Sequence, residues 1–236
     1  METRAIPSTG EKLPVIGCGT YLGFDVSVGS AAYKRLPEVL TALFDAGGSE
    51  LDSSPMYGRA EGVVGHLLKE SGLHKRAFLA TKVWTRGRAA GIAQMESSLQ
   101  LMGVDRIDLM QVHNLLDWRI HLDTLTGWKR DGRTRYVGVT HYTSSAFSDL
   151  AAVMESATID FVQLNYSLDD RAAESRLLKL AQDRGIAILV NRPFGGGPLV
   201  RSLAPEKLPD FAREIGCESW SQLLLTFILT LSLIHI

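Results

Sequence analysis

The chain has 236 residues, of which 45% are hydrophobic and 22% charged, and its formal net charge is −1. This balance provides no basic field for a nucleic acid and no acidic tail for a basic partner, while the apolar content is enough for a sizeable core. The two cysteines, Cys18 and Cys217, supply neither a disulfide framework nor a zinc pattern, so we expect no metal and a reducing, cytoplasmic setting.

The N-terminal segment carries a hairpin signal and no targeting signal. Residues 1–10 contain no apolar run typical of a signal peptide. Residues 2–12 can fold back on themselves around a turn at Ser8, Thr9 and Gly10, just before the first buried strand. At the other end, the apolar-rich run 223–236 is shorter than the ~18 residues that a membrane span needs, so we expect no membrane partner.

Seven short apolar runs predict strands buried on both faces, as in a parallel sheet. They are residues 15–19, 49–53, 77–83, 106–112, 136–140, 161–165 and 187–191. Apolar residues at helical spacing lie between several of them, namely Ile92, Met95, Leu99 and Met102, then Phe147, Leu150, Ala151 and Met154, then Leu177, Leu180 and Ala181. Because helical sequence follows each strand, we predict an α/β fold of right-handed repeats, with residues 1–236 as a single domain.

Such a repeat can close as an open doubly wound sheet or as a (β/α)8 TIM barrel. The first strand's turn, GCGTYLG, has Leu22 where the dinucleotide fingerprint needs a glycine, which counts against the doubly wound sheet. In a barrel, the chemistry lies at the C-terminal ends of the strands. Asp52, Lys82 and His113 stand at or just past the ends of the second, third and fourth strands, and Tyr57 lies on the adjoining loop.

These four side chains could together protonate a carbonyl oxygen. A tyrosine with its ordinary pKa of about 10 is a poor proton shuttle at neutral pH, and we expect the Lys82 ammonium to lower that pKa. Asp52 would neutralise the ammonium, and His113 would donate a ring N–H to the carbonyl oxygen. Such a site needs a hydride donor. Ordinary structural roles for each residue stay open, as does a Schiff-base mechanism with Lys82 as nucleophile.

Several segments, in order, resemble the aldo-keto reductase family: PVIGCGTY, LDSSPMYGRAEGVVG, ATKVW, IDLMQVHN, VQLNYSL and ILVNRPFGGGPL. The resemblance runs from about residue 5 to about residue 229. It implies a (β/α)8 TIM barrel closed at its base by the N-terminal hairpin. It also implies NADPH-dependent reduction of a small-molecule aldehyde or ketone, with Tyr57 as general acid, Lys82 and Asp52 tuning it, and His113 orienting the carbonyl. A cofactor-binding regulatory subunit of the same fold, without significant turnover, is the alternative.

The resemblance also implies a set of cofactor-binding residues. The nicotinamide carboxamide would lie against Thr140, His141 and Gln163, where the family usually has Ser-Asn in place of Thr140-His141. The family's ring-stacking tyrosine falls near Arg192, and an arginine plane can also stack on a ring. Glycines 195–197 would allow the pyrophosphate to approach the backbone. The implied set is Gly19, Thr20, Asp52, Thr140, His141, Gln163, Arg192, Pro193, Phe194, Gly195, Gly196 and Leu199.

The resemblance ends near residue 229. Members of the family continue into an eighth strand and a loop that carries ligands for the cofactor's 2′-phosphate. Residues 229–236, LTLSLIHI, do not resemble that continuation, so we expect the eighth strand to be missing or replaced and the barrel to be incomplete at the C-terminus. The segment LIHI could take the eighth position, but it would bring no phosphate ligands. Without an eighth strand, the edges of the first and seventh strands would be open.

Overall fold

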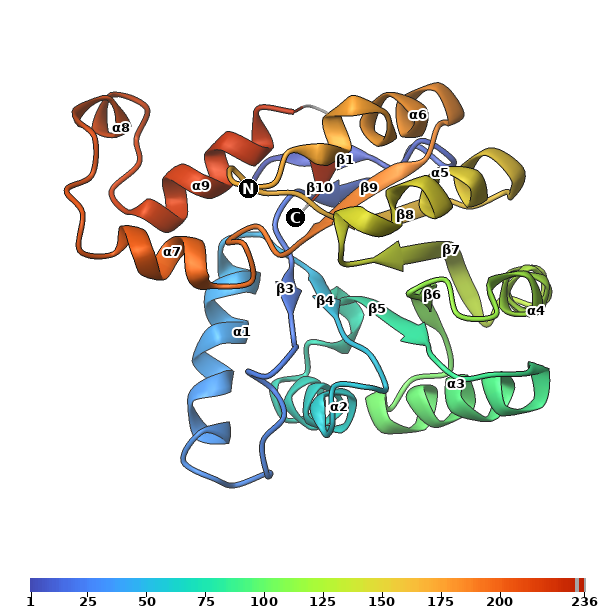
Figure 1. Ribbon diagram of the computed structural model, residues 1–236. Coiled ribbons are helices and arrows are strands. Elements are labelled where there is room, and N and C mark those ends of the chain that lie inside the picture. The colour runs from blue at the N-terminus through green and yellow to red at the C-terminus, as the bar shows by residue number, and fades with distance from the viewer. Residues whose placement is uncertain (232–233, 236) are drawn as a thin grey trace.

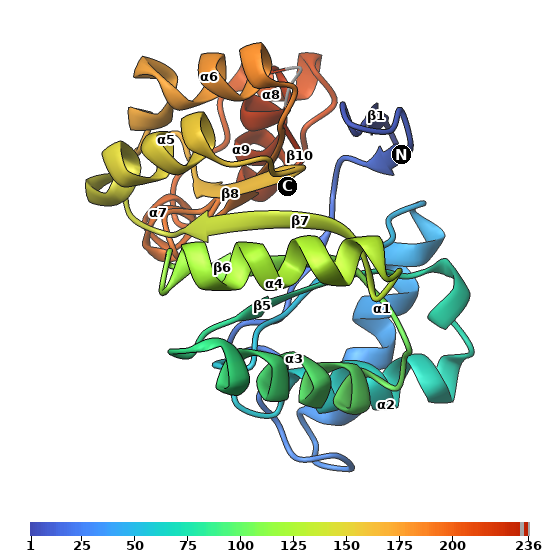
Figure 2. The same cartoon turned by 90° about the vertical axis from the view of Figure 1, so that its right-hand side faces the viewer.

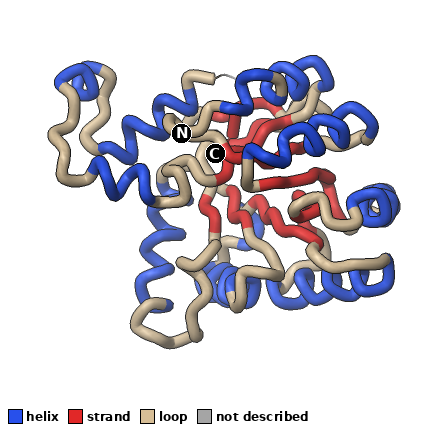
Figure 3. Tube along the Cα trace, in the orientation of Figure 1, coloured by secondary structure: helices blue, strands red, loops and turns tan. Residues whose placement is uncertain are grey.

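The computed structural model describes residues 1–231 and 234–235, and its strands lie at the centre with helices around them (Figures 1 and 3). The strands are β1 (Thr3–Ala5), β2 (Lys12–Pro14), β3 (Cys18–Gly19), β4 (Glu50–Asp52), β5 (Phe78–Val83), β6 (Ile107–His113), β7 (Thr134–His141), β8 (Phe161–Asn165), β9 (Ala187–Asn191) and β10 (Ile234–His235). The helices are α1 (Leu36–Asp45), α2 (Ala60–Ser71), α3 (Arg88–Met102), α4 (Trp118–Arg130), α5 (Phe147–Ser156), α6 (Leu177–Arg184), α7 (Pro198–Leu203), α8 (Asp210–Glu214) and α9 (Trp220–Leu229).

The central sheet follows chain order from β3 to β10, and each pair of neighbours runs parallel. A doubly wound sheet would reverse its order at a switch point, and this order instead fits a barrel wound in one direction. All seven predicted strands are therefore confirmed. The first is shorter than predicted, because only Cys18 and Gly19 pair with β4.

The eighth position of the barrel is occupied by the two-residue strand β10. It pairs with β9 through Ile234 beside Ile188 and His235 beside Leu189. The sequence predicted that the eighth strand is missing or replaced, and the short strand β10 stands in its place. Residues 232, 233 and 236 of the predicted segment lie outside the described residues. Within the described residues, no pairing joins β10 to β3, so the barrel is nearly closed.

The hairpin of β1 and β2 closes the base of the barrel, as predicted. Figure 2 shows it beyond the tail end of β7. Its Ile6 and Leu13 are buried with residues that point inward from the first half of each strand, namely Phe78, Ala80, Leu109, Tyr136, Phe161, Ala187 and Leu189. The rings of Tyr136 and Phe161 meet edge to face with centroids 5.5 Å apart. Apolar packing thus fills the lower half of the interior.

Polar contacts hold the hairpin in place. Glu11 pairs with Arg135 and accepts a 2.5 Å hydrogen bond from the Tyr136 hydroxyl. Arg4 donates to the carbonyl oxygens of Leu229 at 2.7 Å and Leu231 at 2.8 Å. These carbonyls belong to the last residue of α9 and to a residue just past it, where backbone acceptors lack partners within the helix. The hairpin therefore connects the barrel base to the C-terminal helix.

A second core fills the space between the sheet and the helices. The predicted helical faces are confirmed there: Met95, Leu99 and Met102 of α3 and Leu150 and Met154 of α5 are buried in it. Helices α7 and α8 extend away from the barrel beside α9 (Figure 1). The outward-facing side chains of the strands thus pack against the helices. The inward-facing side chains at the carboxyl ends of the strands lie outside both apolar cores and can form a site.

Candidate active site

The inward-facing side chains change from apolar to polar toward the carboxyl ends of the strands. Because side chains alternate along a strand, the interior series that begins with Phe78 and Ala80 continues with Lys82, and the series from Leu109 continues with Gln111 and His113. The same step on the next strands gives Thr140, Gln163, Asn165 and Asn191. Parallel register sets these polar residues side by side, with Lys82 opposite Gln111 and Thr140 opposite Gln163.

Lys82 and Asp52 form a buried ion pair at this level. The ammonium of Lys82 donates to Asp52 Oδ2 at 2.7 Å, to Asp52 Oδ1 at 2.9 Å and to the Ser53 carbonyl oxygen at 2.6 Å. Burial works against the charged lysine, but the negative charge of Asp52 and the other neighbours outweigh it, so the pKa of Lys82 is raised. Lys82 is therefore a fixed cation at neutral pH, and the Gln111 amide adds a 3.4 Å contact to Asp52.

Tyr57 lies against this cation at a sharp turn. Its backbone N–H donates to the Ser54 carbonyl at 2.9 Å, and Ser54 with Pro55 supplies the residue types that β-turns favour at their first two positions. Lys82 Nζ is 5.1 Å from the centre of the Tyr57 ring. Among the described residues, no side chain or carbonyl accepts a hydrogen bond from the phenol, which leaves its O–H available to a substrate.

The predicted direction of the Tyr57 pKa shift is wrong. Burial raises the pKa of Tyr57, and the positive charge of Lys82 offsets only part of that rise. The reason is that desolvation disfavours the phenolate, while the Lys82 charge is largely neutralised by Asp52 at contact distance. The phenol therefore stays protonated at neutral pH, which suits a proton donor.

His113 completes the group from the end of β6. Its ring lies edge-on to Tyr57, with centroids 6.1 Å apart, and the centroid of the Trp84 ring is also 6.1 Å from that of His113. Burial and the nearby Lys82 charge lower the pKa of His113 to about 3. The imidazole is therefore neutral at neutral pH. The structure thus brings together all four side chains predicted for the chemistry, Asp52, Tyr57, Lys82 and His113.

Beneath the ion pair lies a carboxyl group that the sequence analysis did not identify. Glu50 is two residues before Asp52 on β4 and is buried, with no hydrogen-bond partner for Oε2 among the described residues. Burial and the charge of Asp52 raise its pKa to about 8. A side chain at Gly17 would come within 2.9 Å of Glu50, so glycine there makes room for this carboxyl group. The signal was available, since Glu50 shares the inward period of two with Asp52.

The residues predicted for the nicotinamide carboxamide lie at the ends of β7 and β8. Thr140 donates to Gln163 Oε1 at 3.1 Å, which leaves the Gln163 amide hydrogens available. The Thr143 backbone N–H donates to His141 Nδ1 at 3.3 Å. Since a backbone N–H can only donate, Nδ1 of His141 is an acceptor. The pKa of His141 is lowered by burial, so its single ring proton is on Nε2.

The predicted pyrophosphate segment forms a loop between β9 and α7. Arg192 and the glycines 195–197 all have positive φ, from 55° to 106°, and the glycines adopt this conformation without side-chain clash. The Arg192 guanidinium donates to the Tyr142 carbonyl at 3.3 Å and lies 5.7 Å from the Tyr142 ring. Pro193, Phe194 and Leu199 are half-buried along the same loop.

The two predicted residues after β3 have different surroundings. Gly19 pairs with Asp52 at the sheet edge and has open space where a side chain would be. Thr20 is buried, and its hydroxyl donates to the Asp52 carbonyl at 3.1 Å and to Ser53 Oγ at 2.9 Å. Its side chain therefore connects the end of β3 to the end of β4.

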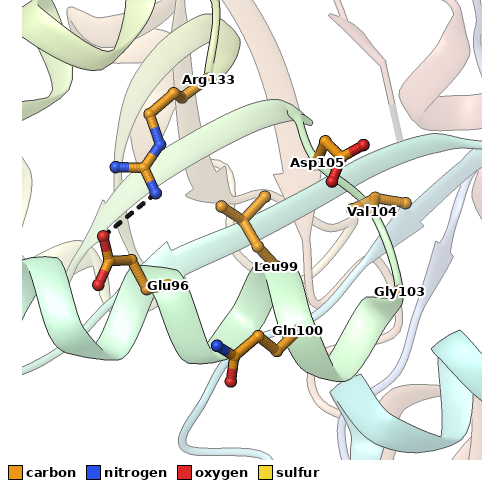
Figure 4. A pocket seen from close by; sticks show the side chains of 7 residues that line it. All are labelled: Glu96, Leu99, Gln100, Gly103, Val104, Asp105 and Arg133. Carbon is orange, nitrogen blue, oxygen red and sulfur yellow. Dashed lines mark hydrogen bonds and ion pairs between the residues drawn. The ribbon is translucent and has the colours of Figure 1, made fainter.

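A separate hollow of about 500 Å³ lies at the opposite end of the strands (Figure 4). It is lined by Glu96, Leu99 and Gln100 of α3, by Gly103, Val104 and Asp105 of the loop before β6, and by Arg133, which pairs with Glu96 at 3.3 Å. Because these segments precede their strands, this hollow is distinct from the site at the carboxyl ends. In residues 1–231 and 234–235 there is no cluster of three or more His, Cys, Asp or Glu that could hold a metal, and no helix long and apolar enough to cross a membrane.

Comparisons with known proteins place this arrangement in a family. The model of the Aldo/keto reductase family matches residues 15–231. Aldo-keto reductase YhdN of Bacillus subtilis is 29% identical over 225 residues, and the match covers 89% of this chain and 66% of YhdN. Aldo-keto reductase yakc [NADP(+)] of Schizosaccharomyces pombe is 27% identical, with 86% and 66% covered. This chain thus spans just under two thirds of the length of these curated relatives.

Solved structures agree on the fold. An aldo-keto reductase from Klebsiella pneumoniae in complex with NADPH superposes with a TM-score of 0.80 at 24% identity, covering 97% of this chain and 82% of that one. A thermostable aldo-keto reductase in complex with epalrestat also gives 0.80, at 22% identity, with 100% and 88% covered. With the family model matching most of its length, the chain belongs to the aldo/keto reductase family.

Proposed function

We propose that the protein reduces aldehyde or ketone carbonyls, with NADPH as hydride donor and Tyr57 as general acid. The observation that carries the proposal is the phenol of Tyr57, whose O–H has no acceptor among the described residues. The centre of its ring lies 5.1 Å from a fully buried ammonium, and the ring lies beside a neutral imidazole. A site of this kind protonates an oxygen on which negative charge develops.

Each side chain has a separate role in that reaction. The nicotinamide, when bound, supplies the hydride to the carbonyl carbon. His113 donates a ring N–H to the carbonyl oxygen and orients it, and Tyr57 gives its phenolic proton to the same oxygen. The Lys82 ammonium then stabilises the phenolate. Asp52, at 2.7 Å, holds that ammonium in place and balances its charge in the buried site.

Residues at the ends of β7, β8 and β9 are suited to hold the nicotinamide. The Gln163 amide hydrogens and His141 Nε2 are hydrogen-bond donors for the carboxamide oxygen. The amide oxygens of Asn165 and Asn191 are buried and have no hydrogen-bond partner in the described part of the chain, so they can accept from the carboxamide nitrogen. The glycines 195–197 suit close approach of a pyrophosphate. The choice of NADPH is supported by the S. pombe relative named for NADP(+) and by the NADPH complex from K. pneumoniae.

A turnover assay tests the proposal directly. We expect NADPH absorbance to fall when the purified protein is mixed with a panel of aliphatic and aromatic aldehydes and ketones, and NADPH to bind in a separate titration followed by its fluorescence. Binding of NADPH without turnover of any carbonyl would contradict the proposal and favour the regulatory subunit. Trapping of a substrate on Lys82 by borohydride would contradict it in favour of a Schiff-base enzyme.

A further inference from the structure

Ser54 lies behind the catalytic histidine and has no role in the reaction described so far. It is completely buried, two residues after Asp52 in the segment LDSSPMYG. Its hydroxyl oxygen lies 3.0 Å from His113 Nδ1 and accepts a longer contact of 3.4 Å from the Met56 backbone N–H. Its carbonyl oxygen accepts the N–H of Tyr57. Ser54 therefore contacts both residues that would touch the substrate oxygen.

The neutral His113 ring carries one N–H, on either Nδ1 or Nε2, and only one choice allows catalysis. Nδ1 is occupied by Ser54, whereas Nε2 has no hydrogen-bond partner among the described residues. A proton on Nε2 can be donated to a carbonyl oxygen. A proton on Nδ1 would leave Nε2 as an acceptor, and two acceptors would then face each other at the substrate.

The hydrogen-bonding of Ser54 favours the Nε2–H form. A buried hydroxyl has to donate its hydrogen, and His113 Nδ1 is the acceptor that the described residues offer to Ser54 Oγ. The Met56 contact cannot serve, since a backbone N–H only donates. If Nδ1 carried the ring proton, the Ser54 hydroxyl hydrogen would be buried without an acceptor, which costs more than an ordinary hydrogen bond contributes.

We propose that Ser54 is a positioning residue that donates its hydroxyl hydrogen to His113 Nδ1 and so holds the imidazole as the Nε2–H tautomer. Its consequence for the rate rests on the proposed carbonyl reduction, whereas the tautomer itself does not. The same residue fixes the turn that presents Tyr57. One buried serine thus orients both hydrogen-bond donors toward the same oxygen.

The tautomer can be observed without substrate or cofactor. Long-range ¹H–¹⁵N correlation spectra of protein labelled at its six histidines distinguish Nδ1–H from Nε2–H rings, and the signal that His113→Gln removes identifies His113. We expect Nε2–H in the wild type and a loss of that preference in Ser54→Ala. Ser98→Ala is the matched control, because Ser98 is equally buried but donates to the Gln94 carbonyl on α3. Its His113 signal should stay unchanged.

Kinetics supply the second readout. Loss of one neutral hydrogen bond predicts a kcat roughly 3- to 10-fold lower for Ser54→Ala, with NADPH affinity unchanged, and Ser54→Thr, which keeps the hydroxyl, should recover kcat. A wild-type spectrum showing Nδ1–H would overturn the proposal, even if Ser54→Ala failed to fold. So would a Ser54→Ala variant with unchanged tautomer and kcat. If the wild-type spectrum shows the Nε2–H tautomer of His113 but the protein turns over no carbonyl, the tautomer assignment is supported and only the proposed function is contradicted.

Discussion

The buried ion pair of Lys82 and Asp52 gives the most quantitative prediction. Lys82 makes three hydrogen bonds of 2.6–2.9 Å and is fully buried, whereas the Asp52 side chain is 15% exposed. Lys82→Met removes the cation and leaves Asp52 with the 3.4 Å Gln111 contact as its remaining side-chain donor. An uncompensated buried charge costs about 3 kcal/mol or more, so we expect a loss of about 3 kcal/mol in the free energy of unfolding.

Urea unfolding followed by circular dichroism measures this loss, which corresponds to a fall in melting temperature of roughly 6–12 °C for a protein of this size. Lys179→Met is the matched control. Lys179 pairs with Asp183 at 2.8 and 2.9 Å, but both side chains are exposed, at 76% and 54%. We expect the control to lose about 1 kcal/mol or less.

The double variant Lys82→Met with Asp52→Asn separates the pair from its surroundings. Because no unpaired charge then remains, we expect it to lose clearly less stability than the two single variants added together. Additive losses, or a Lys82→Met loss as small as that of Lys179→Met, would refute the description of these residues as a buried ion pair. Lys82→Met should also lower kcat, since the lysine charge is what limits the rise in the Tyr57 pKa.

Two further predictions concern pH. Because the Tyr57 pKa is raised above its ordinary value of 10.0, kcat for carbonyl reduction should stay level from neutral pH upward and fall only above about pH 10. Oxidation of an alcohol needs the phenolate, so its rate should rise as the pH increases from neutral. A reduction rate that halves between pH 7 and 9 would contradict this prediction. Glu11 has a pKa lowered by Arg135, so its contribution to stability is present above its ordinary value of 4.5 and lost as the pH falls through the lowered folded-state value. Glu11→Gln should therefore destabilise the protein at pH 7 in urea unfolding, and its difference from wild type should shrink below about pH 4; an equal difference at both pH values would count against the Glu11–Arg135 contact.

Much of the fold followed from local pattern. Strands buried on both faces read as apolar runs, and all seven were predicted within a few residues. The rule that barrel chemistry lies at the strand ends led to Asp52, Lys82 and His113, which the structure brings together around Tyr57. The position of β10 was harder to predict, because a two-residue strand carries too little periodicity to distinguish it from a helix end.

The energetics of the site could not be predicted in the same way. The sign of the Tyr57 pKa shift depends on two opposing effects: burial raises the pKa, and the Lys82 charge, 5.1 Å from the ring centre, lowers it. The spacing of residues in the sequence gives the size of neither effect. The contact of Ser54 with His113 joins residues 59 positions apart, through a turn whose geometry decides where the hydroxyl points. Glu50 precedes Asp52 by two residues and shares its face of the strand, so the period of two alone places it in the barrel interior, whereas its raised pKa depends on burial that the sequence does not give.

The central claim is that Tyr57 delivers the proton to a carbonyl oxygen. The most direct measurement compares kcat of Tyr57→Phe with that of wild type, while NADPH affinity is measured in the same preparations by fluorescence titration. Loss of a general acid predicts a kcat about 10²- to 10⁴-fold lower with NADPH affinity nearly unchanged. A Tyr57→Phe protein that binds NADPH and keeps wild-type kcat would show that the proton comes from another group and would contradict the account.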